Sequence, residues 1–304
     1  MYENFTFEVD AEGVATILLN VPKEKLNILT PAVGSELRQI VTRVQEDRSI
    51  TAAVLGSAKS RSFIAGADIK AIRRLGSASE ATALSREVQL GLNQLEDLWK
   101  KHHKPVVAAI DGAALGGGLE VALCCTLRLV SDAPQTVLAL PEIKLGLIPG
   151  AGGTQRLPRL LGVTHALDMI LTGRNVRPKK ARALGLVDAV VAAPILLQIA
   201  RRRALAQARS TETSSYGTVK GWSQQLLDPK FLQHMALNEN PIGRQWVLRT
   251  AANKALAKSH GNYPALQKAL QVIRIGLEDG LEAGLLAEAE AFGELVVSSE
   301  SKAL

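Results

Sequence analysis

The chain has 304 residues, with 36 Lys and Arg against 29 Asp and Glu, and therefore a formal net charge of +7. This length suffices for one large domain, or for a domain with an appendage. Hydrophobic residues make up 47% of the chain and aromatic residues 4%, so the core must consist mainly of Ala, Val, Leu and Ile. The two cysteines are neighbours, Cys124 and Cys125, which excludes an ordinary disulfide framework and gives no support to a metal site.

The first ten residues, MYENFTFEVD, lack the basic and apolar regions of a signal peptide, so we expect a cytoplasmic location. Residues 106–130 are mostly apolar, but they contain Asp111, Glu120 and Arg128. Each charge at the middle of a membrane costs roughly 2.5–3.5 kcal/mol on insertion scales. We therefore expect no membrane span and interpret this segment as buried core.

The sequence pI of about 9.5 would suit an anionic ligand such as a nucleic acid or a phosphorylated cofactor. The one block of like charges, Arg201–Arg203, lies inside a helical pattern. We interpret this block as the solvated face of a helix, and a nucleic-acid partner is not expected.

Strand and helix patterns alternate along the first part of the chain. The turn at Glu12-Gly13 predicts a hairpin of residues 5–9 and 14–19. Thr30 followed by Pro31 predicts the start of a helix, with Thr30 as its N-cap. The segments that follow are a strand at 51–58, a helix at 77–102, a strand at 104–112, a helix from 117, strands at 127–133 and 136–140, helical segments at 164–173 and 177–185, and a strand at 186–191. From Pro194 the pattern is almost entirely helical, so we expect an α/β layered fold with a helical C-terminal region.

Two segments place small residues where a strand gives way to a helix. In SFIAGADIK, residues 62–70, the turn runs through Ala65, Gly66 and Ala67. In GAALGGGLEVAL, residues 112–123, three glycines precede Glu120. Small residues allow a ligand to approach the backbone, and a helix start offers free N–H donors to an anion. Taken alone, each segment could also be an ordinary turn, with Glu120 as a charge in the capping region.

Glu142 follows a strand and a proline among apolar residues, which could hold its carboxylate partly desolvated. Other motifs fail: GAGGTQ, from Gly150, does not complete the dinucleotide fingerprint, and no P-loop, zinc-protease, C-x-x-C or G-x-S-x-G motif occurs. His102 and His103 have no nucleophile near them in the sequence and are expected to be exposed.

Three segments in consecutive order, FIAGADIK, IDGAALGGGLEVAL and LPEIKLGLIPGAGGTQRLPRLLG, resemble the enoyl-CoA hydratase (crotonase) superfamily. The resemblance covers about residues 5–192. The rest of the chain is similar to the extension found in multifunctional fatty-acid oxidation enzymes, in which a 3-hydroxyacyl-CoA dehydrogenase part follows. The resemblance implies a crotonase-like ββα spiral core over residues 1–192. It also implies a helical region with the start of a linker over 193–304, the dehydrogenase part being absent.

The resemblance assigns the chemistry to four positions. The backbone N–H groups of Ala67 and Gly117 would form an oxyanion hole for the thioester carbonyl of an acyl-CoA. Glu120 would orient and deprotonate a water molecule, and Glu142 would deliver a proton to the α-carbon. The implied reaction is the reversible hydration of a trans-2-enoyl-CoA to a 3-hydroxyacyl-CoA in fatty-acid β-oxidation.

The resemblance also implies how the substrate is held. The adenine of CoA would lie against the backbone of residues 65–69, and its phosphates near lysines. The residues expected to contact the substrate are Lys25, Ala65, Gly66, Asp68, Ile69, Lys70 and Gly116. No metal or redox cofactor is expected, since NAD belongs to the dehydrogenase part. In the full-length enzyme a thiolase subunit is the expected partner.

Two alternatives remain open from the sequence. The same oxyanion hole with one glutamate would serve a Δ3-Δ2-enoyl-CoA isomerase. A noncatalytic RNA-binding or acyl-CoA-binding member of the superfamily would have no use for two buried acids. We further expect that apolar surface around Phe292, Leu295 and Val296 is exposed where the downstream part is missing.

Overall fold

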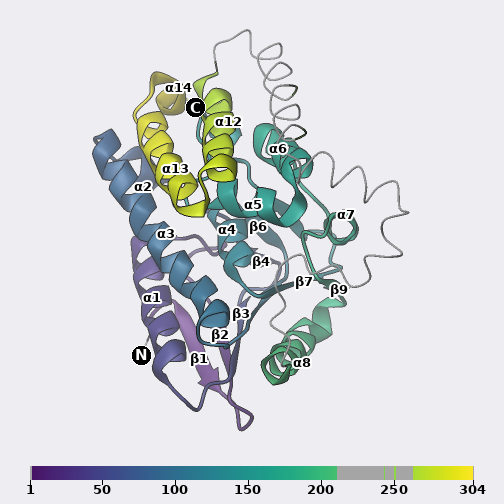
Figure 1. Cartoon of the computed structure of the whole chain (residues 1–304). Coiled ribbons are helices and arrows are strands. Elements are labelled where there is room, and N and C mark those ends of the chain that lie inside the picture. The colour runs from purple at the N-terminus through teal and green to yellow at the C-terminus, as the bar shows by residue number, and fades with distance from the viewer. Residues whose placement is uncertain (1, 211–242, 244–249, 251–262, 304) are drawn as a thin grey trace.

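The computed structural model describes residues 2–210, 243, 250 and 263–303 of the chain (Figure 1). Its larger sheet has six strands in the order β1-β2-β3-β5-β7-β9. The strands are β1 (Phe5–Val9), β2 (Val14–Leu19), β3 (Ala52–Ser57), β5 (Val106–Ile110), β7 (Leu127–Ser131) and β9 (Ala189–Val191). β1 and β2 form the predicted antiparallel hairpin, and every other neighbouring pair of this sheet is parallel.

A second, smaller sheet contains three parallel strands, β4 (Ser62–Ile64), β6 (Ala113–Leu115) and β8 (Val137–Ala139). The chain visits the two sheets in turn, passing from β3 to β4, from β5 to β6 and from β7 to β8. A helical segment follows each pair. These segments are α2 (Ile69–Arg73) with α3 (Ala78–Lys100), then α4 (Gly117–Cys124), and finally the short 3-10 helix η1 (Glu142–Leu145) with α5 (Gly153–Leu161) and α6 (Val163–Thr172). The repeated β-β-α course confirms the expected spiral core.

The larger sheet is covered on both faces, because alternate residues of a strand point to opposite sides. On one face Val54, Val107 and Leu129 pack against α8 (Leu196–Arg209), which contributes Leu196 and Ala200. On the opposite face, alternate strand residues join the main core with α1 (Pro31–Glu46) and α3. Figure 1 shows α8 alone at the lower right of the sheet, away from the other helices.

The remaining helices are α7 (Pro178–Leu184), the short 3-10 helix η2 (Ala193–Ile195), α12 (Pro264–Glu278), α13 (Leu281–Val296) and α14 (Ser299–Ala303). In Figure 1, α12 and α13 lie beside α3 and α5, and their buried residues belong to the main hydrophobic core. The division at residue 192 stays a prediction. The stretch 211–262, predicted to be helical, lies almost entirely outside the described residues.

Phe292, Leu295 and Val296 are buried, with exposed fractions of 7%, 3% and 4%. The expected exposure was therefore wrong, because these residues of α13 pack into the main core. The apolar segment 106–130 was interpreted correctly, since it folds into β5, β6, α4 and β7. Among the helices that the structure describes, none has the length and apolar character needed to cross a membrane.

Candidate active site

The three segments that were predicted to carry the site residues, 62–70, 112–123 and the one around Glu142, meet at one edge of the small sheet. β4 leads into Ala65–Ala67, β6 into Gly116 and Gly117, and β8 into Pro141 and Glu142. Parallel strands bring their carboxyl ends to the same edge. Segments separated by tens of residues in the sequence thereby become neighbours in the fold.

Gly116 lies close to both of the other segments. A Cβ built there would lie 2.8 Å from Glu142 Oε1 and 4.0 Å from the Gly66 Cα, and the residue has a φ of +52°. Its N–H donates to Ala139 O at 2.9 Å, which fixes the turn to the end of β8. Only glycine fits this conformation and this contact.

The Ala67 and Gly117 N–H groups both lie in this turn region. Leu29 pairs with Ala67 in a parallel bridge, donating to Gly66 O at 2.9 Å and accepting from the Asp68 N–H at 3.1 Å. In this pattern Leu29 is hydrogen-bonded to Gly66 and Asp68, the residues on either side of Ala67, and the Ala67 N–H points away from Leu29. In the part of the chain that the structure describes, neither the Ala67 nor the Gly117 N–H donates a hydrogen bond to the protein. A Cβ on Gly117 would lie 3.9 Å from Ala67 N, so the two donors border the same small space.

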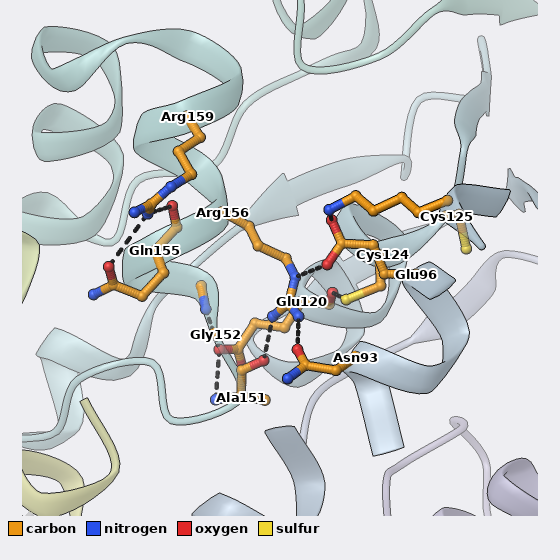
Figure 2. A network of polar contacts seen from close by, with 12 residues as sticks. Asn93, Glu96, Glu120, Cys124, Cys125, Ala151, Gly152, Gln155, Arg156 and Arg159 are labelled. Atoms are coloured by element: carbon orange, nitrogen blue, oxygen red, sulfur yellow. Dashed lines mark hydrogen bonds and ion pairs between the residues drawn. The ribbon is translucent and has the colours of Figure 1, made fainter. Parts of the chain in front are cut away.

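Glu120 is buried in the first turn of α4, with an exposed fraction of 3%. Its Oε1 accepts from the Ala151 N–H and the Gly153 N–H, both at 2.8 Å (Figure 2). Burial raises the pKa of Glu120 well above its usual value, and the charges of Glu142 and Glu288 add to this effect. The two N–H donors, at the start of α5, act in the opposite direction and favour the carboxylate.

Glu142 is half-buried as a residue, but its Oε2 atom is buried and has no hydrogen-bond partner among the described residues. Burial raises the pKa of Glu142 to about 8. Glu120 Oε1 accepts two N–H bonds from the 151–153 segment, whereas the Glu142 carboxyl is favoured as an anion only by its own backbone N–H. The site thus combines a carboxyl group held by two backbone donors with a second carboxyl group that has a buried oxygen without a described partner.

A further carboxylate and an arginine surround the loop that holds Glu120. Glu288 of α13 is fully buried and accepts from the Gly152 N–H at 2.6 Å. Arg156 of α5 donates to Asn93 Oδ1 at 2.6 Å and to Ala151 O at 3.1 Å, and it pairs with Glu96 at 3.2 Å (Figure 2).

The sequence reasoning missed both Glu288 and Arg156. The Gln155-Arg156 pair inside an apolar helix could have indicated a buried cation. Glu288 stands beside the exposed Glu290 in a helical AEAEAF pattern, and nothing in that pattern distinguishes the buried glutamate.

Several residues predicted to contact CoA lie around this edge. Lys25 and Lys70 are exposed, and no described contact engages them with the site. Asp68 accepts from the Lys70 and Ala71 N–H groups and so caps α2. The Ala65 N–H donates a hydrogen bond to Asn27 O at 2.8 Å.

Ile69 is 46% exposed and borders a cavity of about 130 Å³. Ile72, Leu145 and Val296 give this cavity an apolar lining, and Lys302 is one of its polar residues.

Other candidates lie elsewhere. His102 and His103 are exposed, as expected. Arg201 pairs with Asp10 and Glu12 on the outside of the sheet, which agrees with a solvated helix face. Among the described residues there is no group of three or more His, Cys, Asp or Glu side chains that could hold a metal ion.

The sequence profile of a family described as "Enoyl-CoA hydratase/isomerase" matches residues 10–239. The chain belongs to the enoyl-CoA hydratase/isomerase family. It is 43% identical over 300 residues to the fatty acid oxidation complex subunit alpha of Vibrio campbellii, and 44% identical over 304 residues to that of a Shewanella species, strain ANA-3. These matches cover 99% and 100% of this chain but 40% of each relative, so the chain spans less than half the length of these relatives.

Solved structures of the family share the fold. An enoyl-CoA hydratase from Bacillus anthracis is 29% identical with a TM-score of 0.62, and the match covers 92% of this chain and 98% of that one. Pseudomonas aeruginosa DspI is 33% identical, with a TM-score of 0.62, over 69% of this chain and 82% of its own. The crotonase fold expected from the sequence is therefore confirmed.

Proposed function

We propose that this chain catalyses the reversible hydration of trans-2-enoyl-CoA to 3-hydroxyacyl-CoA. The observation that carries the proposal is the pair of buried carboxyl groups, Glu120 and Glu142, beside two backbone N–H groups without protein partners. Its relatives are named as subunits of a fatty acid oxidation complex, so we place the reaction in fatty-acid β-oxidation. A thiolase partner and a cytoplasmic location stay predictions.

The backbone donors account for activation of the thioester. When the oxygen of water adds to the β-carbon, negative charge moves onto the thioester carbonyl oxygen. The Ala67 and Gly117 N–H groups border a space where that oxygen can accept both hydrogen bonds. Donors fixed in this way are worth on the order of 3–4 kcal/mol each in comparable sites.

The two carboxyls divide the proton transfers. Glu120, whose Oε1 is held by the Ala151 and Gly153 N–H groups, takes a proton from the attacking water. Glu142, whose pKa of about 8 keeps it protonated near neutral pH, gives its proton to the α-carbon. The proton gained by Glu120 then returns to Glu142, so that one water is consumed for each product formed.

Isomerisation of Δ3-enoyl-CoA needs the same two N–H donors and a single carboxyl group. A catalyst of that reaction alone would not require a second buried acid, whose desolvation costs stability. The presence of both Glu120 and Glu142 favours hydration as the main activity.

The test is loss of the conjugated absorbance of crotonyl-CoA and of a longer enoyl-CoA. We expect the unmodified chain to turn over, and Glu120→Gln and Glu142→Gln each to lower kcat by about 100-fold or more, because each removes one proton transfer. The dissociation constant for a 3-hydroxyacyl-CoA should change little. Glu290→Gln, an exposed position on α13, is the matched control and should retain full activity. Unchanged activity in either active-site variant would refute the assignment.

A further inference from the structure

Four consecutive backbone N–H groups, those of residues 151–154, are held by two buried carboxylates in alternation. The Ala151 and Gly153 N–H groups donate to Glu120 Oε1, both at 2.8 Å. The Gly152 N–H donates to Glu288 Oε1 at 2.6 Å, and the Thr154 N–H to Glu288 Oε2 at 2.9 Å. Because the donors alternate along the chain, a movement of residues 151–154 away from one carboxylate would also displace the donors of the other carboxylate.

The surroundings of Glu288 are those of an ionised group. Besides the two backbone donors, Gln89 Nε2 donates to its Oε1 at 3.0 Å, and the Thr154 hydroxyl lies 2.5 Å from its Oε2. Gln155 Nε2 donates to the Thr154 Oγ1 at 2.9 Å, which directs the hydroxyl proton toward Glu288. The Gln89 amide and the two backbone N–H groups can only donate, and the Thr154 hydroxyl donates as well. These hydrogen bonds favour the carboxylate and oppose burial, which raises the pKa of Glu288.

The position of Glu288 is fixed by α13, which carries it, and by α3, against which α13 packs tightly. A Cβ on Gly293 would lie 2.1 Å from the Thr82 Oγ1 and 2.5 Å from the Ala78 carbonyl oxygen. Gln89 of α3 also donates to Leu285 O at 3.0 Å, which joins the two helices next to Glu288. The carboxylate therefore stands on a rigid pair of helices.

We propose that Glu288 is a positioning residue: it holds the 151–154 loop so that the Ala151 and Gly153 N–H groups point at Glu120. The kinetic part of this inference rests on the proposed function. Among the described residues no hydrogen bond joins Glu288 to Glu120, and the two carboxylates are connected through the backbone N–H groups of residues 151–154. A region outside the predicted 1–192 core thus completes the geometry of the site.

The charge of Glu288 has an effect of its own. The ionisable groups that interact electrostatically with Glu288 are Glu120 from α4, Glu142 from η1 and Arg156 from α5. Its negative charge raises the pKa of both Glu120 and Glu142, after the larger effect of burial. Its removal should lower both pKa values, because less negative charge then opposes ionisation.

The kinetic experiment compares Glu288→Gln with Glu290→Gln, which removes an exposed carboxylate from the same helix. In Glu288→Gln, an amide nitrogen must face one of the loop donors. We expect kcat for crotonyl-CoA to fall at least about tenfold with KM within about threefold, since misplaced catalytic groups slow chemistry more than binding. The acid limb of the pH profile of kcat/KM should move to lower pH by about half a unit, which a purely structural role would not cause.

The Glu288→Asp variant distinguishes the effect of the negative charge from the effect of side-chain length. It retains the anion but is one methylene shorter, so it cannot contact all four donors. We expect kcat to fall as in the glutamine variant while the acid limb stays where it is in the control. This variant also decides the matter if Glu288→Gln does not fold.

A second measurement does not depend on activity. Hydrogen exchange of the Ala151 and Gly153 amides, which bind Glu120 and not Glu288, should be at least about tenfold faster in Glu288→Gln than in Glu290→Gln. If the unmodified chain shows no turnover, the proposed function fails, and the exchange rates alone decide the role of Glu288. Unchanged exchange with kcat within twofold of the control would overturn the inference.

Discussion

In the proposed oxyanion hole, a side chain on Gly117 would compete directly with the substrate oxygen. A Cβ there would lie 3.9 Å from Ala67 N and 2.9 Å from the Leu29 Cδ1, which is the end of a flexible side chain. Gly117→Ala should therefore fold, with Leu29 shifting, but its methyl group should fill the space between the two donors. We expect kcat/KM for crotonyl-CoA to fall about 100-fold or more, because the oxyanion can no longer reach both N–H groups.

Gly34 provides the matched control for this substitution. It lies in α1, and a Cβ built there has nothing within 4 Å. Gly34→Ala should leave turnover unchanged and should raise the free energy of unfolding by roughly 0.5–1 kcal/mol, since alanine favours a helix interior. Equal activity of the Gly117→Ala and Gly34→Ala variants would show that Gly117 is not part of the oxyanion hole.

The burial of Glu142 should make stability depend on pH. Its pKa is raised from 4.5 to about 8 in the folded chain, so its favourable contribution is complete below pH 4.5 and is lost as the pH rises through 8. Above that pH, the folded state must keep a desolvated charge. Glu142→Gln should therefore raise the free energy of unfolding by about 1–3 kcal/mol at pH 9 and by much less at pH 5. Urea titrations at the two pH values measure this difference, and an equal effect at both would contradict the buried acid.

Residues differ in how well the sequence revealed them. Glu120 and Glu142 stood out because a charge beside glycines or apolar residues is costly unless it is used. Glu288 did not stand out, because a glutamate in an alanine-rich helix is ordinary. Asn27 was also missed. It is fully buried and bonds to the backbone of residues 19, 21 and 63, which joins the loop before α1 to β4. Both missed residues acquire their partners only through tertiary packing.

Among the elements, long patterns were predicted well, and of the three-residue strands β8 and β9 lie inside predicted strands whereas β4 and β6 do not. The α1 helix begins after Thr30, whose side chain accepts from the Val33 N–H, as the capping pattern predicted. The strands β4 and β6 were not predicted, because both lie inside segments, 62–70 and 112–123, that were interpreted as turns of small residues. A strand this short has no periodicity, and its pairing with neighbours far along the chain determines it.

The placement of α12 and α13 depends on small residues that the sequence did not explain. Cβ atoms on Gly276 and Gly284 would lie 1.7 Å and 2.2 Å from the Gln155 Oε1. Gln155 also donates to Val272 O at 3.0 Å, so its amide lies between the two C-terminal helices and binds one of them. The sequence alone does not show that these two glycines are contact positions, because the contact depends on the packing of α5 against α12 and α13.

At the scale of the whole molecule, the helices after residue 262 complete the main core. They contribute buried residues such as Val272, Ile273 and Phe292, as well as Glu288. A chain ending at residue 210 should lose this apolar burial and leave the loop donors unpaired. We expect it to show no cooperative thermal unfolding by circular dichroism and no turnover, whereas the 304-residue chain should show both. A cooperative transition near that of the complete chain would support an independent domain over residues 1–192.

The spiral course has a consequence for how such a protein can change over time. Each turn of the spiral adds one strand to the small sheet and contributes one part of the proposed site, namely the Ala67 donor, then the Gly117 donor with Glu120, then Glu142. The donors proposed to polarise a thioester and the acid proposed to serve one particular proton transfer therefore lie on separate turns. Replacing the turn after β8 would exchange the acid without disturbing the donors. An ancestral thioester-binding frame could in this way acquire a new reaction by altering a single stretch of sequence.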